Sequence, residues 1–300
     1  YADWSAVDKE DAEEYALDLY GEEITRYLFE PAMQGLCYQT LKGNSQALMM
    51  ISGMSADKRP KGHTLSTGLG AITTMMHRRM RVKTGHTVTA LERDGDKVNV
   101  TVNGNVQQAD FVFLAVPAPI AKTLWKGVDS VEQSLLDTDY SSTIGFSLVT
   151  NRRWQDQNGL NGVYGMSIPG VERDMVAAAS FKSQKNTASD FKGEVVSIAL
   201  AGSEAEKRWD ESNDALSEKA MEELQAYLPG LKDSVIDVRA QRWKNAEPYS
   251  PVGRSYALAR YRFKGVEDKR VMLVGDYMST PTVEGAIESA EWAVSQLPAS

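Results

Sequence analysis

The segment near the carboxyl end of the sequence, KRVMLVGDYMSTPTVEGAIESAEWAVSQL, constrains the fold more tightly than any other. Val271 to Val274 form a short apolar run, which predicts a buried strand that ends at Gly275 and Asp276. A helix is then expected to open near Thr282. Apolar residues recur there at three- and four-residue steps, so they are predicted to form one side of the helix. They are Val283, Ala286, Ile287, Ala290, Ala293, Val294 and Leu297. The segment is therefore predicted to be a strand, a glycine turn and a helix start.

The opening of that helix is a candidate binding site for an electron-rich group. The unpaired amides of a first turn and the positive end of the helix dipole both favour negative charge. We expect the amides from Val283 and Glu284 to Gly285 and Ala286 to face a ligand, and the two small residues to allow its close approach. Glu284 also complements the helix dipole. Asp276 would repel a phosphate, so we expect it to accept hydrogen bonds from ligand hydroxyl groups.

Composition excludes several classes of protein. The chain has 300 residues, of which 42% are hydrophobic, so it is long enough to bury a large core. Its formal net charge of -8 argues against a nucleic-acid partner. One cysteine, Cys37, and three scattered histidines give no metal-ligand spacing, and the single thiol favours a reducing, cytoplasmic setting. The acidic start, YADWSAVDKEDAEE, does not resemble a signal peptide, and no apolar run is long enough to span a membrane, although peripheral contact with a membrane stays open.

The first third of the chain is predicted to be mainly helical. Residues 5–30 carry apolar positions at helical spacing, including Ala12, Ala16 and Leu19, and the pattern restarts after Gly21, which favours two helices. Methionines are frequent between residues 49 and 80. We expect them to fill an irregular core, and the alternative is a flexible apolar wall for a substrate.

The spacing then changes from helical to extended. Val88 begins an alternating pattern that is interrupted by turns at Asp94-Gly95 and Asn103-Gly104, so a β-meander is predicted. The run FVFLAVP, residues 111–117, is continuously apolar. It predicts a strand buried on both faces, as in a parallel or mixed central sheet.

A second, antiparallel sheet is predicted further along the chain. Its strands are expected within residues 139–150, 160–181, 194–201 and 234–243. A helix from Ser212 to Leu228 lies between the later strands, with Leu216, Ala220 and Leu224 on its apolar side. We therefore predict an α/β (α+β) chain with two interwoven domains. Residues 61–130 and 251–300 form an incomplete Rossmann-like domain, and residues 1–60 and 131–250 form a domain of antiparallel sheet and helices.

Four blocks of the sequence resemble the flavin amine-oxidase superfamily, which includes protoporphyrinogen oxidases, amine oxidases and carotenoid desaturases. VGDYMSTPTVEGAIESAEWA is similar to the C-terminal FAD signature of that family. LSTGLGAITTMM resembles its glycine-rich turn and helix, although it departs from the usual Gly-Gly start. HTVTALERDGDKVNVTVNGNVQQADFVFLAVP resembles its meander and the strand that follows, and WKNAEPYSPVG resembles its tryptophan-to-proline stretch beside the flavin.

The resemblance implies FAD as cofactor and an FAD-binding role for the Rossmann-like domain. The family's cofactor contacts match Val88 on the adenine side, the strand end from Ala115 and Val116 to Pro117, and Trp243 beside the flavin. The cysteine that carries a covalent flavin in monoamine oxidases has no counterpart around Ser255-Tyr256, so the FAD is expected to be non-covalent.

A strand followed by GxGxxG and a helix, which grips the FAD pyrophosphate in this family, has no counterpart in the sequence. The nearest candidate, Gly68-Leu69-Gly70, lacks the third glycine. We therefore expect the first half of the FAD site to be supplied by a missing N-terminal portion or by a separate subunit. The chain alone is expected to bind FAD weakly.

The resemblance leaves three functions open. Block order and length are closest to protoporphyrinogen-oxidase-like proteins, which implies hydride transfer to flavin from a bulky, largely apolar small-molecule substrate. An amine oxidase or desaturase is the second possibility, although the family's lysine near the flavin corresponds to Ile144 here. A non-catalytic remnant or partner subunit is the third. A large anionic substrate would need a cation at its site, for which the candidates are Arg152, Arg153, Arg242 and Arg254.

Overall fold

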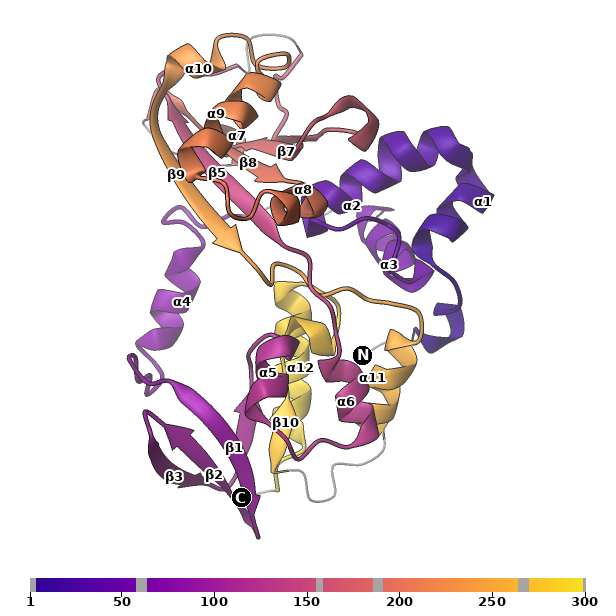
Figure 1. The fold of residues 1–300 in the computed structure, drawn as a ribbon, viewed down its shortest axis with the longest axis vertical. Helices are drawn as coiled ribbons and strands as arrows, with labels where there is room; N and C mark the ends of the chain where they lie inside the picture. The colour runs from indigo at the N-terminus through magenta and orange to yellow at the C-terminus, as the bar shows by residue number, and fades with distance from the viewer. Residues whose placement is uncertain (1–3, 58–63, 155–158, 186–190, 264–269, 299–300) are drawn as a thin grey trace.

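The computed structural model describes residues 4–57, 64–154, 159–185, 191–263 and 270–298. They form two lobes that the chain crosses between more than once (Figure 1). We call the upper one in Figure 1 the sheet lobe and the lower one the meander lobe. None of the helices in these described ranges is both long and apolar enough to cross a bilayer.

The meander lobe contains the predicted three-stranded meander and a short parallel sheet. Strands β1 (Val88–Asp94), β2 (Lys97–Val102) and β3 (Asn105–Ala109) pair in that order and are antiparallel, which confirms the meander. Strands β4 (Val112–Leu114) and β10 (Val271–Leu273) pair in parallel, with Met272 opposite Phe113. The helices of this lobe are α5 (Ala118–Leu124), α6 (Ser130–Leu136), α11 (Arg254–Phe263) and α12 (Val283–Ser295).

The parallel sheet differs from the prediction in one respect. Residues 111–117 were expected to be buried on both faces, but Phe113 is 38% exposed, whereas Leu114 is 5% exposed. The cause is that this sheet has only two strands among the described residues, so one edge and one side of β4 lack neighbours. All three residues of β10 are buried, as predicted.

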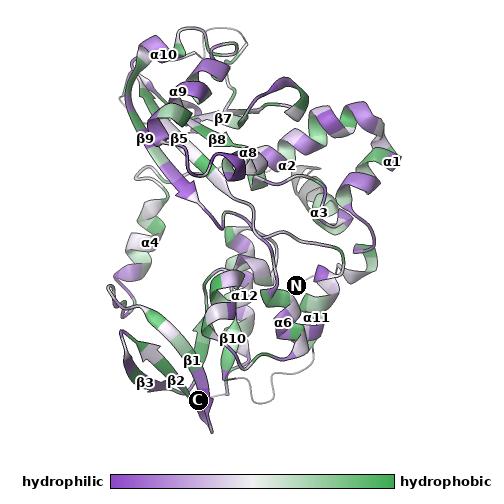
Figure 2. Cartoon of the chain, viewed as in Figure 1, coloured by the Kyte–Doolittle hydropathy of each residue, from purple (hydrophilic) through white to green (hydrophobic). Residues whose placement is uncertain are grey.

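The sheet lobe contains the predicted antiparallel sheet. Its strands are β5 (Thr143–Thr150), β6 (Gly165–Ser167), β7 (Val176–Phe181), β8 (Glu194–Leu200) and β9 (Val235–Trp243), in the order β6-β7-β8-β5-β9. Hydrophobic residues run along β5 and β8, whereas β9 at the edge is more hydrophilic (Figure 2). Short helices join the strands: η3 (Gly170–Glu172), α7 (Lys182–Lys185), α8 (Gly202–Lys207) and α10 (Leu231–Ser234).

Helix α9 (Asn213–Leu224) packs on one face of this sheet, as the sequence predicted. Ser212 caps the helix by accepting a hydrogen bond of 3.2 Å from the amide of Ala215. Leu216, Ala220 and Leu224 are fully buried in one core with the alternate residues of the strands. The large side chains of the sheet are therefore gathered on one face, and small side chains remain on the other.

The N-terminal helices flank the sheet lobe. Their bounds are η1 (Ser5–Val7), α1 (Ala12–Ile24), η2 (Thr25–Phe29), α2 (Glu30–Cys37) and α3 (Gln46–Asp57). Gly21 interrupts α1 with a φ of 79°, which confirms the predicted break at this glycine. Ala12 and Ala16 are buried, but Leu19 is 56% exposed, because only one narrow side of α1 contacts the rest of the molecule.

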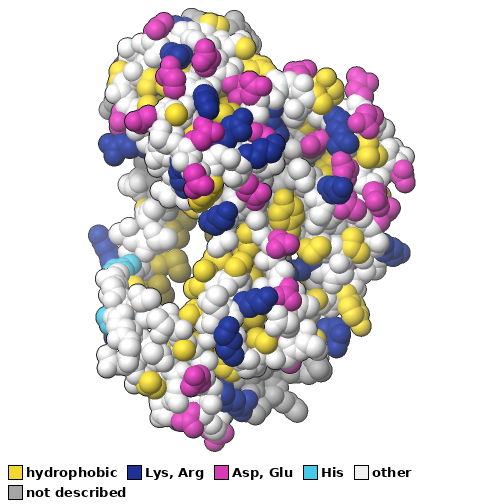
Figure 3. All heavy atoms as spheres, viewed as in Figure 1, with side chains coloured by type: hydrophobic (Ala, Val, Ile, Leu, Met, Phe, Trp, Pro, Cys, Tyr) yellow, Lys and Arg dark blue, Asp and Glu magenta, His cyan; other side chains and the backbone are white. Residues whose placement is uncertain are grey.

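Helix α4 (Gly70–His77) stands apart from both lobes and has no buried residue (Figure 1). Met75, Met76 and Met80 are each more than half exposed. The prediction that the methionines fill a core is therefore wrong for these three. The surface is hollowed between α4 and the two lobes, and hydrophobic side chains line this opening (Figure 3).

Two crossing segments join the lobes and are hydrogen-bonded to each other. The amide of Ser141 donates to the carbonyl of Glu247 at 2.9 Å, and the amide of Tyr249 donates to the carbonyl of Asp139 at 2.9 Å. These bonds extend the pairing of β5 with β9 toward the meander lobe, and we call residues 139–142 and 246–249 the crossing ribbon. The side chains of α6 pack in the core of the meander lobe, so the chain enters the sheet lobe at this ribbon and not at the predicted boundary of residue 131.

Candidate functional site

The turn after β10 and the start of α12 form one side of a pocket, which we call the turn pocket. It has a volume of about 330 Å³. Three separate segments line it: the end of β4, the crossing ribbon, and the turn with the first residues of α12. The lining residues are Ala115, Val116, Pro117, Glu247, Gly275, Asp276, Thr282, Val283 and Ala286.

Seven of these nine residues were predicted from the sequence as cofactor contacts: Ala115, Val116, Pro117, Gly275, Asp276, Val283 and Ala286. The fold brings them together because β4 and β10 are parallel neighbours, so their carboxyl ends open at the same edge of the sheet. Their predicted role in binding a cofactor stays a prediction.

The conformation of the turn depends on Gly275. Its φ of 135° lies in the region that favours glycine, and a Cβ atom there would lie 3.2 Å from the ring of Tyr277. Ser289 of α12 holds the turn in place, because its Oγ accepts a hydrogen bond of 2.9 Å from the amide of Gly275. Sequence reasoning missed Ser289, although a polar residue one turn beyond Gly285 on the buried side is the signal that indicates it.

The first turn of α12 offers fewer amides than predicted. Thr282 caps the helix by accepting a hydrogen bond of 3.0 Å from the amide of Gly285, and the amide of Ala286 donates to the carbonyl of Thr282 at 3.0 Å. The amides of Val283 and Glu284 have no partner among the described residues. Only these two amides are therefore available to a ligand.

Gly285 has a different role from the one predicted. A Cβ atom at this position would lie 2.0 Å from the carbonyl oxygen of Thr280, so the missing side chain lets α12 pack against its own preceding loop. Glu284 is exposed and does not line the turn pocket. These two predicted contacts therefore support the helix start from outside the pocket.

The predicted apolar side of α12 is also only partly correct. The buried side consists of Gly285, Ser289 and Ala293. Val283, Ile287 and Val294 are 78%, 48% and 56% exposed, and we call them, with the exposed Ala290, the apolar stripe of α12. Small residues face the sheet because α12 approaches it closely, and the larger apolar residues point away.

Asp276 is held by neighbours in the turn pocket. Its carboxylate accepts hydrogen bonds from the amide of Tyr277 at 2.7 Å and from the hydroxyl group of Tyr140 at 3.5 Å. The hydroxyl of Tyr140 in turn accepts from the amide of Ala118 at 3.3 Å. Burial raises the pKa of Tyr140, so this phenol stays neutral and able to donate. Asp276 is thus oriented as an acceptor within the protein, and its predicted contact with ligand hydroxyl groups stays a prediction.

A second cavity lies on the open face of the antiparallel sheet, and we call it the sheet cavity. Its volume is about 890 Å³. Alternate residues of four strands supply a floor of small side chains: Gly145, Ser147, Gly165, Ser167, Ala178, Ser180, Ser197 and Ala199. Larger residues, among them Tyr38, Tyr164 and Trp243, stand around this floor. Small residues at every second position of TIGFSLVT and VVSIALAG are the sequence signal that indicates this cavity.

Trp243 and Val88 do not line the turn pocket. Trp243 lines the sheet cavity, where its ring would be 3.1 Å from a Cβ atom at Gly145, and it is 46% exposed. Val88 begins β1 and is 36% exposed. The structure therefore separates these two predicted cofactor contacts from the other group.

The four arginines proposed as substrate cations have structural roles instead. Arg152 lies over the ring of Trp154, Arg153 donates to the carbonyl of Gly193, Arg242 donates to the carbonyls of Trp209 and Glu211, and Arg254 donates to Thr138 and to the carbonyl of Tyr277. None of them lines the sheet cavity or the turn pocket. Lys182 and Arg239 are the cations that line the sheet cavity, and sequence reasoning did not single them out.

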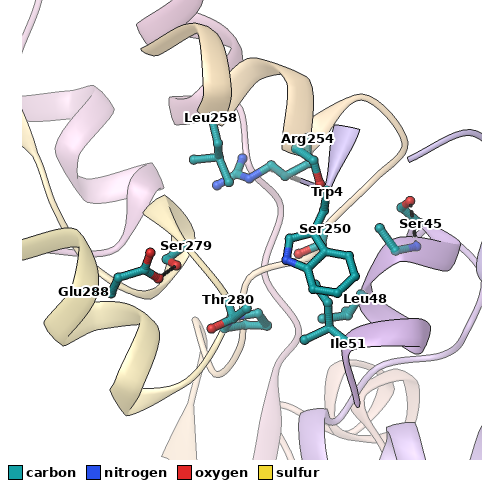
Figure 4. Close-up of a pocket in the computed structure, with 13 residues that line it drawn as sticks. Trp4, Ser45, Leu48, Ile51, Ser250, Arg254, Leu258, Ser279, Thr280 and Glu288 are labelled. Atoms are coloured by element: carbon teal, nitrogen blue, oxygen red, sulfur yellow. Dashed lines mark hydrogen bonds between the residues drawn. The ribbon is translucent and has the colours of Figure 1, made fainter. Parts of the chain in front are cut away.

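Arg254 is one of the residues that line a small pocket of about 80 Å³ (Figure 4). It lies where the N-terminal segment meets α11 and the loop before α12, and Trp4, Leu48 and Ile51 form one wall. Glu288 accepts a hydrogen bond from Ser279 on the opposite side and pairs with the buried Arg262 at 3.1 Å. The pocket therefore borders both the N-terminal segment and the loop that leads into the turn pocket, and Glu288 ties that loop to α11.

No cluster of metal-ligating side chains occurs in the described part of the chain. Cys37, the single cysteine, is partly buried, and burial raises its pKa to about 11. Its thiol is therefore protonated at neutral pH, and Cys37 does not line the turn pocket.

Comparisons with known proteins identify the family. The family model for flavin-containing amine oxidoreductases matches residues 6–297. The chain belongs to this family of oxidoreductases. A comparison with curated protein sequences gave no match.

Solved structures share the fold at low sequence identity. A candidate protoporphyrinogen oxidase from Exiguobacterium sp. 255-15 superposes with a TM-score of 0.76 and 17% identity over 95% of this chain and 66% of that one. A redesigned putrescine oxidase gives 0.73 and 13%, over 97% of this chain and 68% of that one. Cyclohexylamine oxidase from Brevibacterium oxydans IH-35A gives 0.72 and 12%, with the same coverage. The chain thus spans about two thirds of the length of these structures.

The turn pocket fits the flavin that the family name implies. The helix N-terminus with the free amide of Val283 lines it, small residues line it as well, and Asp276 is oriented to accept hydrogen bonds from hydroxyl groups. Its volume lies at the lower end of the range for small-molecule sites, which begins at roughly 300 Å³. In the described ranges, no strand precedes Gly68 and Gly70 in a strand, glycine turn and helix arrangement, so these residues do not form a pyrophosphate site.

Proposed function

We propose that this chain is the portion of an FAD-dependent oxidoreductase that holds the flavin ring and the substrate. The observation that carries this proposal is the turn pocket, where the ends of two parallel strands and the start of α12 converge. When bound there, the flavin would supply the chemistry by accepting a hydride from the substrate. The free amide of Val283 would stabilise negative charge on the ring, and Asp276 would bind hydroxyl groups of the cofactor's sugar-like chain.

The binding would be non-covalent. Cys37 is the chain's single cysteine and is absent from the lining of the turn pocket. A thioether link from this chain to the flavin therefore has no suitable residue there. Denaturation of the loaded protein should release all of the flavin into solution.

We further propose a bulky, largely apolar substrate, as in protoporphyrinogen oxidation, bound in the sheet cavity. The small floor leaves a broad, flat space, and its volume of about 890 Å³ is near the upper end of ligand pockets. Lys182 and Arg239 would meet acidic groups on such a substrate. Arg239 pairs with Asp237 at 3.0 Å, so Lys182 is the better candidate for this contact.

An amine substrate is the second candidate, and one observation favours it. Glu247 and Asp276 place two carboxyl groups at the proposed flavin site, and negative charge beside the bound ring would attract a cationic amine toward it. Two of the structural neighbours are amine oxidases by name. The two candidate functions predict substrates of opposite charge for the same chain, because one substrate is anionic and the other is cationic.

The remaining part of the cofactor site would come from a complementing segment, either elsewhere in the same protein or in a separate subunit. Three features support this proposal: the edge of β4 away from β10 is unpaired among the described strands, the apolar stripe of α12 is exposed, and α4 buries no residue. A strand with flanking helices would cover all three. Open strand edges and exposed apolar stripes are otherwise liabilities in a folded chain.

The test is to produce the chain with and without a GxGxxG-containing flavoprotein segment from one of the structural neighbours or from the adjoining coding sequence. We expect yellow, stoichiometric FAD only in the complemented protein. Porphyrin fluorescence from porphyrinogen substrates and peroxide release from amines would then separate the two candidate reactions. Loaded protein that turns over neither class would favour a non-catalytic role, and failure of both forms to take up any flavin would contradict the proposed cofactor.

A further inference from the structure

Two carboxyl groups line the turn pocket, and they differ in their surroundings. The carboxylate of Asp276 accepts hydrogen bonds from the amide of Tyr277 and the hydroxyl of Tyr140. The carboxyl group of Glu247 receives no hydrogen bond or ion pair from any residue in the described part of the chain. Its main chain, by contrast, is fixed on the crossing ribbon, where Gln39 and Ser141 both donate to its carbonyl oxygen.

The groups that surround Glu247 are neutral or acidic. Asp276 faces it across the pocket, and Cys37 and Tyr38 at the end of α2 interact with it electrostatically. Two cations of neighbouring segments have partners elsewhere: the ammonium group of Lys244 lies 5.0 Å from the ring centre of Trp209, and Arg254 donates to the carbonyl of Tyr277. The strand end at residues 115–117 and the first turn of α12 bring no further charge into the lining.

This environment disfavours the ionised form of Glu247. Burial, with a smaller contribution from the charge of Asp276, raises the pKa of Glu247 to about 7. The carboxyl group therefore changes its charge near neutral pH. It also stands where a ligand in the turn pocket would displace the water that still solvates it.

We propose that Glu247 takes up a proton when the cofactor occupies the turn pocket, so that cofactor binding and protonation of this one carboxyl group are linked. This inference rests on the proposed function, because it requires the ligand of the pocket to be a flavin. A flavin ring presents carbonyl oxygens along its edge, and a protonated Glu247 can donate a hydrogen bond to such an acceptor. An ionised Glu247 has no proton to donate and would repel both the acceptor and Asp276 in a drier pocket.

The first experiment measures affinity against pH. The complemented protein, freed of its flavin, is titrated with FAD, and separately with riboflavin, by flavin fluorescence between about pH 6 and about pH 9, on either side of the expected titration. We expect the Kd to weaken by up to about tenfold per pH unit above about pH 7. Glu247→Gln should bind with an affinity that is nearly independent of pH and equal to that of the wild type at low pH, because glutamine resembles the protonated acid.

A matched variant controls for net charge. Glu291→Gln removes the same charge from an exposed position on α12 outside the pocket, and it should keep the pH dependence of the wild type. Calorimetry in two buffers with different ionisation enthalpies gives a second readout that does not depend on activity. Near pH 8, wild type and Glu291→Gln should take up close to one proton per flavin, as expected for a single linked group, and Glu247→Gln should take up about none.

The outcomes separate this inference from the proposed function. Flavin binding that does not change with pH, or that keeps its pH dependence and proton uptake in Glu247→Gln, would overturn the role of Glu247 and leave the cofactor proposal intact. Affinity that increases with pH would also overturn it, because the ionised form would then be the one that binds. If neither FAD nor riboflavin bound at any pH, both proposals would fall.

Discussion

The hydroxyl group of Tyr261 accepts a hydrogen bond of 2.9 Å from the backbone amide of Leu273, and this contact occupies the outer edge of β10. The amides of Val112 and Val274 bond across the β4–β10 pair, so the alternate residues of each strand direct their amides outward. On β10 the outward amide of Leu273 is satisfied by Tyr261. On β4 the outward edge, at Phe113, is open among the described strands.

Removing the hydroxyl group of Tyr261 should therefore destabilise the meander lobe. Leu273 is 1% exposed, so Tyr261→Phe would leave a buried amide without an acceptor, at a cost of about 1 to 3 kcal/mol. Urea unfolding monitored by circular dichroism would measure this loss. Tyr256→Phe, on the same helix but 59% exposed, should leave the midpoint nearly unchanged.

The open edge predicts where a complementing segment would bind. Phe113→Lys and Ile287→Lys place charges on the edge of β4 and on the apolar stripe of α12, and each should weaken co-purification of the complementing segment at least tenfold, or about 1.4 kcal/mol. Neither change should unfold the chain alone, because both side chains are exposed. Val171→Lys changes an exposed apolar residue of the sheet lobe and serves as the control. Undiminished co-purification of both variants would place the partner elsewhere.

Gly285→Ala should disturb the start of α12. Its Cβ atom would meet the carbonyl oxygen of Thr280 at 2.0 Å, so the loop that forms one wall of the turn pocket must shift. We expect a loss of about 1 to 3 kcal/mol in the free energy of unfolding, together with weaker flavin binding. Gly70→Ala in α4 meets no atom within 4 Å and should be neutral or slightly stabilising.

Stability should depend on pH through Glu247. Its pKa is about 7 in the folded chain and near the ordinary value of 4.5 when unfolded, so between these values the folded state holds a proton that the unfolded state has lost. The associated stability is fully present below about pH 4.5 and is lost as the pH rises through 7. The loss should be on the order of 1 to 3 kcal/mol, after allowance for partial solvation. Urea midpoints at several pH values should show this trend in the wild type but a weaker one in Glu247→Gln.

Filling the floor of the sheet cavity should select against large substrates. Ser197→Phe adds a ring to a floor of small side chains, and we expect it to raise KM at least tenfold for a bulky substrate, or about 1.4 kcal/mol, while a small one is little affected. Lys182→Met should reduce binding of an acidic substrate. Lys185→Met, which removes a charge that does not line the cavity and lies over the ring of Tyr164, should not. Equal losses for large and small substrates in Ser197→Phe would argue against this cavity as the substrate site.

Sequence periodicity was sufficient to predict the strands and helices whose apolar side packs against other elements of the same lobe. The strands of the sheet lobe and the apolar side of α9 agree with the prediction, because each packs within one lobe. Periodicity misplaced the buried side of α12, where Gly285 and Ser289 pack closely and Ile287 is exposed. Apolar residues that have no described neighbour follow the same pattern in the sequence as core residues, so pattern alone does not distinguish them.

The site was partly predictable for a related reason. The strand ends at Ala115 and Gly275 could be placed together because parallel strands end at a common edge. Glu247 was missed because it reaches the pocket through pairing with Ser141, more than one hundred residues earlier, and no local pattern reports such a pairing.

The crossing ribbon has a mechanical consequence. A pair of hydrogen-bonded strands bends perpendicular to its own plane more easily than it twists or shears. We therefore expect the two lobes to move relative to each other by bending of the crossing ribbon. Glu247 is anchored on that ribbon and Asp276 on the meander lobe. Any swing would alter the separation of the two acids, and the charge state of the pocket would thereby report the angle between the lobes.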